Sequence, residues 1–330
     1  EEDETGCCTA TRDFEDVKEV CNKLNIPYYS VNFAKIYMDK VFSYFLKEYE
    51  AGRTPNPDVL CNREVKFGPF LDYAKSIGAD YIATGHYCKI EHRNGKHYLL
   101  KADDLNKDQT YFLNQLNQKQ LEIVMFPVGN LLKPQVREIA KKYNLNTAVK
   151  KDSTGICFIG ERKFKDFLKT YLPAQPGNII NESGKIIGKH EGIMYYTLGQ
   201  RRGLNIGGVK NNNGRWFVVG KNVAENTLIV SCGESDKLYS SSLVATEVNW
   251  IPEPPENKEF ICFAKFRYRQ EDQKVKVKIE EDKVFVEFNE KSRAVTPGQY
   301  VVFYGGINEN GEFNENGTYC LGGGIISSAN

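Results

Sequence analysis

The chain has 330 residues, long for a single domain and sufficient for two or three domains that each bury a core. Hydrophobic residues make up 41% and charged residues 26%, an ordinary globular composition, and no apolar run approaches the length that crosses a bilayer, so we expect no membrane association. The formal net charge of +1 argues against a uniformly basic nucleic-acid-binding protein, so any basic surface must be local.

The cysteine pattern argues against a structural zinc site. Nine cysteines lack C-x-x-C spacing, and the four histidines do not cluster with them. No secretory apolar segment is visible, so we expect a reducing compartment, the cytoplasm or an organelle matrix, in which most thiols stay reduced.

The first half of the chain alternates helical and strand patterns. Apolar spacing predicts helices over 11–24, 41–49, 70–77 and 134–143, and helical character resumes at 107–113. Short runs predict strands over 28–33 and 81–84, and a hairpin over 86–101 turns at Asn94-Gly95. This alternation predicts an α/β domain with a parallel sheet, whose functional residues lie at the carboxyl ends of its strands.

The second half is dominated by short strands and polar turns. A break at 173–177 and another at 252–255 separate a small, mostly β middle domain from a C-terminal antiparallel barrel with about five strands. We therefore expect a catalytic domain over 1–165, a middle domain over 166–240 and a barrel over 241–330.

Two cysteines lie in segments suited to chemistry. The first, Cys61, follows a loop that two prolines keep out of regular helix, and Asp58 precedes it by three residues, so a carboxylate could move protons near a thiol. The second, Cys157, lies in a glycine-containing loop among lysines and arginines that favour the thiolate. Either cysteine alone fits a packed thiol equally well, but together they suit a two-thiol reaction.

Two further segments indicate ligand contacts. Gly85 and His86 follow the strand predicted at 81–84, where a small residue permits close approach of a nucleotide, although His86 fits a hydrogen-bonded core histidine as well. Residues 265–270 interleave cations with aromatic rings, a pattern typical of RNA-binding barrels, while a solvated strand face is the alternative.

Six motifs support a resemblance that runs nearly from end to end. They are AGRTPNPDVLCN at 51–62, ATGHY at 83–87, KDQTYFL at 107–113, KDSTGICFIG at 151–160, YYTLGQR at 195–201 and AKFRYRQ at 264–270. In this order they resemble the tRNA-specific 2-thiouridylases, a group of ATP pyrophosphatases with an adenine-nucleotide-hydrolase-like fold.

The resemblance implies site residues and partners. Cys157 matches the cysteine that carries the persulfide. Cys61 matches the second catalytic cysteine, which could form a transient disulfide with Cys157, and Asp58 matches the acid/base group. Gly85 matches an ATP contact. The positions that match contacts with the target base or the rest of the tRNA are Asn56, Pro57, Asp58, Lys107, Asp108, Gln109, Arg267 and Tyr268.

The activity implied is ATP-dependent 2-thiolation of the wobble uridine of tRNA. ATP adenylates the C2 oxygen of the uridine. Mg²⁺ is expected to accompany the phosphates of ATP, and the sequence shows no protein ligands for it. A cysteine desulfurase or sulfur-relay protein loads the persulfide. The alternatives are a related ATP pyrophosphatase that adds nitrogen, which needs neither cysteine, and a tRNA-binding remnant without catalysis. A thioredoxin-like oxidoreductase is disfavoured because the two cysteines are far apart in sequence.

One departure concerns nucleotide binding. The family begins with a strand and a Ser-Gly-Gly-x-Asp-Ser loop that holds the ATP pyrophosphate, and this motif does not occur in the 330 residues. We therefore expect the chain as printed to bind ATP poorly and to be inactive, or nearly so, on its own.

Overall fold

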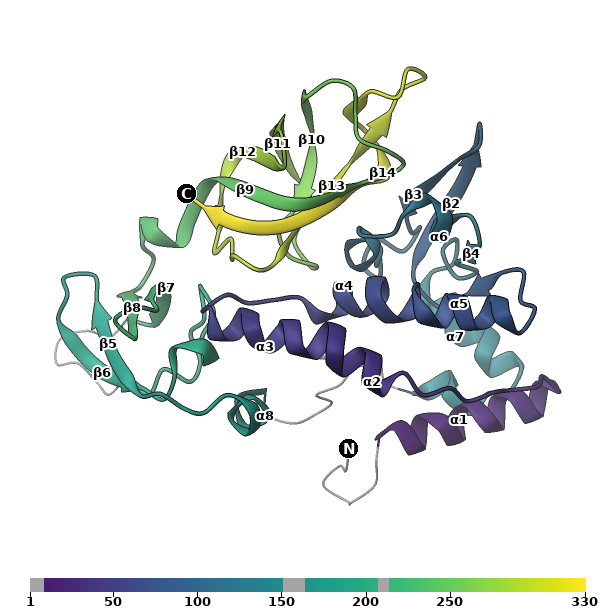
Figure 1. Cartoon of the computed structure of the whole chain (residues 1–330), viewed down its shortest axis with the longest axis horizontal. Coiled ribbons are helices and arrows are strands. Elements are labelled where there is room, and N and C mark those ends of the chain that lie inside the picture. The colour runs from purple at the N-terminus through teal and green to yellow at the C-terminus, as the bar shows by residue number, and fades with distance from the viewer. Residues whose placement is uncertain (1–8, 151–163, 207–213) are drawn as a thin grey trace.

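The computed structural model describes residues 9–150, 164–206 and 214–330. Helices dominate the first of these ranges and lie in rows beneath a β-barrel (Figure 1). These helices are α1 (Thr9–Leu24), α2 (Ala34–Tyr37), α3 (Ser43–Glu50), α4 (Pro57–Cys61), α5 (Pro69–Ser76), α6 (Gln118–Leu121) and α7 (Lys133–Lys142). A wider π-helical turn at Met38–Phe42 joins α2 to α3, so that these two helices form one rod. A second π-helical turn at Asn62–Lys66 continues α4, and α4 with this turn is called the α4 rod.

The helices predicted from apolar spacing are confirmed. The rod that ends at α3 buries Val41, Phe45 and Tyr49, which follow one another at four-residue intervals on one face. The segment at 107–113 forms a 3₁₀ turn at Thr110–Leu113 rather than an α-helix.

The parallel sheet of this region is small in the described residues. It consists of β1 (Ile82–Ala83) and β4 (Val124–Met125), which run parallel. The strand predicted over 28–33 is wrong, because these residues form no strand and pair with no other strand in the described part of the chain, and Tyr29 is 77% exposed. A short run rich in aromatic and apolar residues predicted a strand, but a strand needs a neighbour for its backbone hydrogen bonds.

The hairpin predicted over 86–101 is confirmed and joins the first region to the barrel. It is formed by β2 (Cys88–Arg93) and β3 (Lys96–Lys101), with Asn94 and Gly95 both at positive φ in the turn. Strand β3 also pairs with barrel strand β14 (Phe313–Ala329), so the hairpin extends the barrel sheet.

The barrel contains six antiparallel strands and is closed, because β13 pairs with both β10 and β14. On β11, Val275 and Val277 are buried in the core while the alternating residues Lys274, Lys276 and Lys278 are exposed, as strand alternation requires. The strands not yet bounded are β9 (Tyr239–Trp250), β10 (Glu259–Lys265), β11 (Gln273–Glu280), β12 (Lys283–Arg293) and β13 (Tyr300–Ile307).

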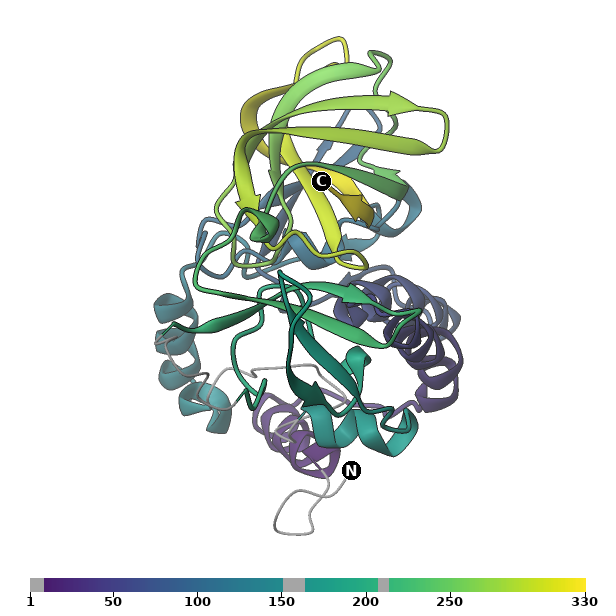
Figure 2. The same ribbon diagram turned by 90° about the vertical axis from the view of Figure 1, so that its left-hand side faces the viewer.

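The middle region is a four-stranded sheet of order β6-β5-β8-β7, preceded by α8 (Phe164–Tyr171). Figure 2 shows this sheet beneath the barrel and beside the α2–α3 rod. Its core includes Phe42 and Phe45 of that rod, together with Phe167 and Leu168 of α8. Its strands are β5 (Gly177–Asn181), β6 (Ile186–His190), β7 (Trp216–Asn222) and β8 (Thr227–Cys232).

A second core joins the barrel to the helical region. Tyr300 and Tyr304 of β13 lie in the same buried cluster as Phe67, Leu99 and Tyr111. The helical region therefore meets both the middle sheet and the barrel through apolar, closely packed interfaces, which hold it to each of them more firmly than polar interfaces would.

Candidate active site

Helix α4 carries two of the predicted catalytic residues, Asp58 and Cys61. Pro57 occupies its first turn, where its missing N–H costs nothing, and Asn56 caps it by accepting a hydrogen bond from Val59 N at 3.4 Å. Residues three apart on a helix share a face, so the carboxyl and the thiol emerge side by side. Cys61 is a half-buried, reduced thiol.

Asp58 is a carboxyl group in a mostly dry environment. Burial raises its pKa, and the ammonium of Lys66 opposes that rise. A carboxyl group whose pKa moves toward neutrality exchanges protons more readily at the working pH, which is what general acid/base catalysis requires.

Lys66 connects the end of the α4 rod to the end of β1. Its ammonium donates to Asn62 Oδ1 at 2.9 Å and lies 3.4 Å from His86 Nε2. His86 Nδ1 in turn lies 2.7 Å from Thr84 Oγ1. Because an ammonium only donates, His86 Nε2 is the acceptor, and the ring proton sits on Nδ1 facing Thr84.

His86 is held neutral. Burial, assisted by the Lys66 charge, lowers its pKa to about 3. A neutral ring at this position can neither repel nor neutralise an approaching phosphate, so the only cation of this hydrogen-bonded group is Lys66.

Gly85 lies two residues after the end of β1, at the carboxyl end of the parallel pair. A Cβ built on it would meet no atom within 4 Å, so the backbone there is open to close approach. This is the location that the sequence predicted for a nucleotide contact.

The predicted residues at 107–109 mostly support the local fold. Asp108 is only 5% exposed, and its carboxylate accepts from Ala102 N at 3.1 Å and from Thr110 Oγ1 at 2.7 Å. Gln109 Oε1 accepts from Tyr87 N at 3.0 Å, and Lys107 is half-buried. In this structure Asp108 therefore orders the turn and does not face solvent.

Arg267 and Tyr268 follow β10 and point in different directions. The ring of Tyr268 packs on Phe112 with centroids 4.4 Å apart, which joins the barrel to the 107–113 segment. Arg267 is an exposed residue, but its guanidinium donates to Ala294 O and is partly buried, and this burial, assisted by Arg293, lowers its pKa.

Arg267 lies close to the YYTLGQR segment of the middle region. A Cβ on Gly199 would stand 3.4 Å from a guanidinium nitrogen of Arg293 and 4.0 Å from one of Arg267. Arg201 and Arg202, both exposed, follow in the same segment. These arginines form a local basic surface where the middle region meets the barrel.

Sequence patterns did not identify Lys66 or Arg293. Lys66 becomes part of the site because a π-helical turn follows α4, and Arg293 because strand β12 ends beside Gly199. Cys157, predicted as the second thiol, lies outside the described residues.

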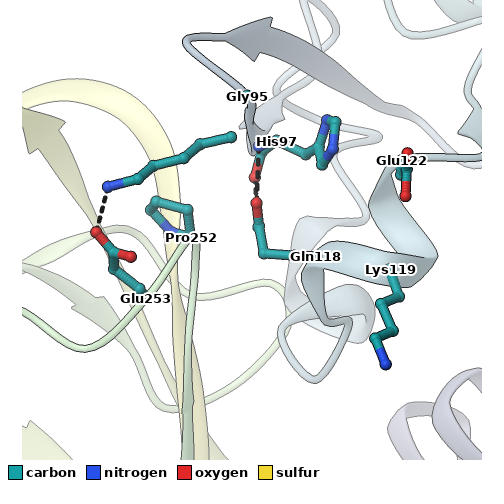
Figure 3. A pocket seen from close by; sticks show the side chains of 8 residues that line it. Gly95, His97, Gln118, Lys119, Glu122, Pro252 and Glu253 are labelled. Atoms are coloured by element: carbon teal, nitrogen blue, oxygen red, sulfur yellow. Dashed lines mark hydrogen bonds and ion pairs between the residues drawn. The ribbon is translucent and has the colours of Figure 1, made fainter.

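The pocket in Figure 3 lies elsewhere, between the β2–β3 hairpin, α6 and the segment that follows β9. His97 N donates to Gln118 Oε1 at 2.8 Å, and Lys96 pairs with Glu253 across it. None of the predicted site residues lines it, so we assign it no part in the chemistry.

Comparison with known families accounts for this arrangement. Residues 1–161 match the model described as tRNA methyl transferase HUP domain, 165–232 the tRNA methyl transferase PRC-barrel domain, and 240–326 the aminomethyltransferase beta-barrel domain. The fold is thus a HUP-type domain with a parallel sheet, followed by a mostly β middle domain and a closed antiparallel barrel.

Curated relatives are similar over nearly the whole chain. The tRNA-specific 2-thiouridylase MnmA of Bacillus cytotoxicus is 57% identical over 326 residues, 98% of this chain and 84% of the relative. The protein of that name from Oceanobacillus iheyensis is 58% identical over 329 residues, 99% of this chain and 85% of the relative. The chain therefore belongs to the tRNA-specific 2-thiouridylase family.

Proposed function

We propose that the protein catalyses ATP-dependent 2-thiolation of the wobble uridine of tRNA. The observation that carries the proposal is the placement of Asp58 and Cys61 on one face of α4, in a rod whose Lys66 contacts His86 at the end of β1. The names of the relatives, which are tRNA-specific 2-thiouridylases, supply the substrate class.

ATP activates the uridine in the proposed first step. The C2 oxygen is a poor leaving group, so it attacks the α-phosphate of ATP, pyrophosphate departs, and the base becomes an adenylate. Gly85 leaves room for the nucleotide, and the Lys66 ammonium offsets negative charge beside it. Mg²⁺ would arrive with the phosphates, because among residues 9–150, 164–206 and 214–330 no group of three or more His, Cys, Asp or Glu side chains is arranged to hold a metal.

Sulfur enters in the second step. A persulfide on Cys157, loaded by a cysteine desulfurase or sulfur-relay protein, attacks C2 with its terminal sulfur, and AMP leaves with the oxygen. The thiolate of Cys61 then attacks Cys157 Sγ, forming a transient disulfide and releasing the thiolated base. In the alternative order Cys61 first frees hydrosulfide, which attacks C2. In either order Asp58 accepts the proton that the attacking thiol group loses, and cellular thiols then reduce the disulfide.

We further propose that the later domains bind the tRNA. We propose a division at 165 and 240 into catalytic, middle and barrel domains, with Arg267 and its arginine neighbours holding tRNA phosphates. Asn56 would then face the target base at the start of the helix that carries Cys61, and the buried Pro57 would support it from within the fold. Tyr268, Lys107, Asp108 and Gln109 shape the adjoining surface.

Nucleoside mass spectrometry tests the proposal. Because the 330 residues lack the Ser-Gly-Gly-x-Asp-Ser loop, the wild type in this and the later turnover assays is the protein with that strand and loop added at its N-terminus. It is incubated with unmodified tRNA, ATP, Mg²⁺ and a sulfur donor and compared with its Cys157→Ser variant. We expect 2-thiouridine only when Cys157 is intact. ATP cleavage without any 2-thiouridine would favour the nitrogen-adding alternative, and tRNA binding without ATP cleavage would favour a binding protein.

A further inference from the structure

The segment Gly52-Arg53-Thr54-Pro55 is held by all three domains. It connects α3 to α4, and Arg53 pairs with the buried Glu48 of α3, with Nε 2.6 Å from Oε2. The middle domain contributes Lys221, whose ammonium donates to Gly52 O at 2.9 Å. A second contact from that domain places Thr197 Oγ1 3.3 Å from Thr54 Oγ1.

The barrel holds the same segment through the loop between β12 and β13. Thr54 N donates to Pro297 O at 3.1 Å. The amide of Gln299 donates to Thr54 O at 2.7 Å and to Pro55 O at 3.2 Å. Both of its hydrogens are therefore used on consecutive carbonyls of a segment far away in sequence.

The backbones of the β12–β13 loop and of the 52–55 segment approach each other closely at Gly298. Gly298 has φ +91°, and a Cβ on it would stand 3.0 Å from the backbone N, C and O atoms of Thr54. Only glycine permits both the φ value and the contact. The loop thus touches the 52–55 segment by backbone, which leaves little freedom for either to shift alone.

The held segment leads directly into the candidate catalytic helix. Pro55 is followed by Asn56, which caps α4, and Asp58 and Cys61 lie within the next five residues. Proline restricts φ at 55 and 57, so a displacement of the Pro55 carbonyl passes to the start of α4 instead of being absorbed between them.

We propose that Gln299 is a positioning residue for Cys61 and Asp58: by fixing the carbonyls of Thr54 and Pro55, the barrel sets the orientation of α4. The link to turnover rests on the proposed function, whereas the link to the geometry of Cys61 does not. The same bonds make the barrel, which carries Arg267, and the thiol helix parts of one rigid unit.

Cys61 alkylation tests the positioning directly. Iodoacetamide labelling of the protein is followed by peptide mass spectrometry, and the rate constant at Cys61 is compared between wild type and Gln299→Ala. Loss of both hydrogen bonds frees the start of α4, so we expect Cys61 to be labelled at least about threefold faster. In thiolation assays we expect kcat to fall about tenfold with the KM for tRNA changed less than about twofold, because misplacement affects the reacting geometry more than binding.

A matched control separates positioning from general loosening. Asn249 of β9 also reaches from the barrel to the first domain with two amide hydrogen bonds, to Asn114 O at 2.9 Å and Leu116 O at 3.0 Å. These bonds hold the segment after the 3₁₀ turn and not the residues that lead into the start of α4. Asn249→Ala should leave the Cys61 rate within about 1.5-fold of wild type. Equal rates for the wild type and the Gln299 variant, or equal acceleration by both variants, would overturn the proposal.

A second variant of Gln299 and the alkylation assay cover a failure of folding and a failure of turnover. If Gln299→Ala does not fold, Gln299→Glu keeps the side-chain volume but sets a carboxylate against two carbonyl oxygens, and the same acceleration is expected. If wild type forms no 2-thiouridine, the proposed function fails, yet the alkylation comparison still decides whether Gln299 positions Cys61.

Discussion

His86 shows how one contact fixes the charge state of a site residue. Burial and Lys66 lower its pKa from 6.5 to about 3, so between these two values the unfolded chain binds more protons than the folded one. The free energy of unfolding therefore falls as pH drops from 6.5 toward 3, and near neutrality the ring is uncharged. The site then presents Lys66 as the cation beside Asp58.

The replacement Lys66→Met tests this contact. Removing the ammonium should raise the pKa of His86, while the remaining burial should keep it below 6.5. Imidazole NMR titration measures the shift, with His86→Asn assigning the signal and Lys75→Met, an exposed lysine of α5, as control. A wild-type His86 that titrates near 6.5 would show that the ring is not buried as described.

At the scale of elements, the β12–β13 loop depends on one glycine. Gly298 combines φ +91° with backbone contact to Thr54, whereas Gly311 has φ +82° and open space around its Cβ position. Gly311→Ala should cost about 1–2 kcal/mol for the left-handed backbone alone. Gly298→Ala should cost at least about 1 kcal/mol more, because the neighbouring backbone must also move. Urea unfolding measures both; equal costs would mean that the loop does not press on Thr54.

Local sequence patterns predicted elements well where the cause is local. The spacing of Val41, Phe45 and Tyr49 and the Asn94-Gly95 turn each reflect neighbouring residues, and both features are present. The 28–33 segment was mispredicted because a strand depends on a partner elsewhere. Within the site, the motifs indicated Asp58 and Cys61, but the contact of Lys66 with His86 and that of Gln299 with Thr54, 245 residues away, arise only from folding.

In the whole molecule, one contact between the middle and first domains is made by a buried lysine, Lys221. Burial lowers the pKa of Lys221, which bonds to Gly52 O, from 10.5 to about 8. Between these values the unfolded state binds more protons, so this group makes the protein more stable as pH rises from 8 to 10.5. The stability of wild type relative to Lys221→Met should therefore increase across that range.

Chemical denaturation at several pH values checks this prediction, with Lys189→Met, an exposed lysine of the same domain, as the matched control. The Lys189 difference should stay nearly constant with pH. A constant Lys221 difference would mean that its ammonium is solvated and that the middle domain does not enclose it against the 52–55 segment.

The central claim is that Cys61 serves sulfur transfer and not activation of the base. The most direct measurement follows tRNA-dependent pyrophosphate release and 2-thiouridine formation in the same reaction, for wild type, Cys61→Ser and Cys232→Ser, the last replacing a half-buried cysteine of the middle domain. We predict that Cys61→Ser releases pyrophosphate at no less than about half the wild-type rate but forms 2-thiouridine at least about 100-fold more slowly, while Cys232→Ser resembles wild type in both. Undiminished 2-thiouridine formation by Cys61→Ser would contradict the account.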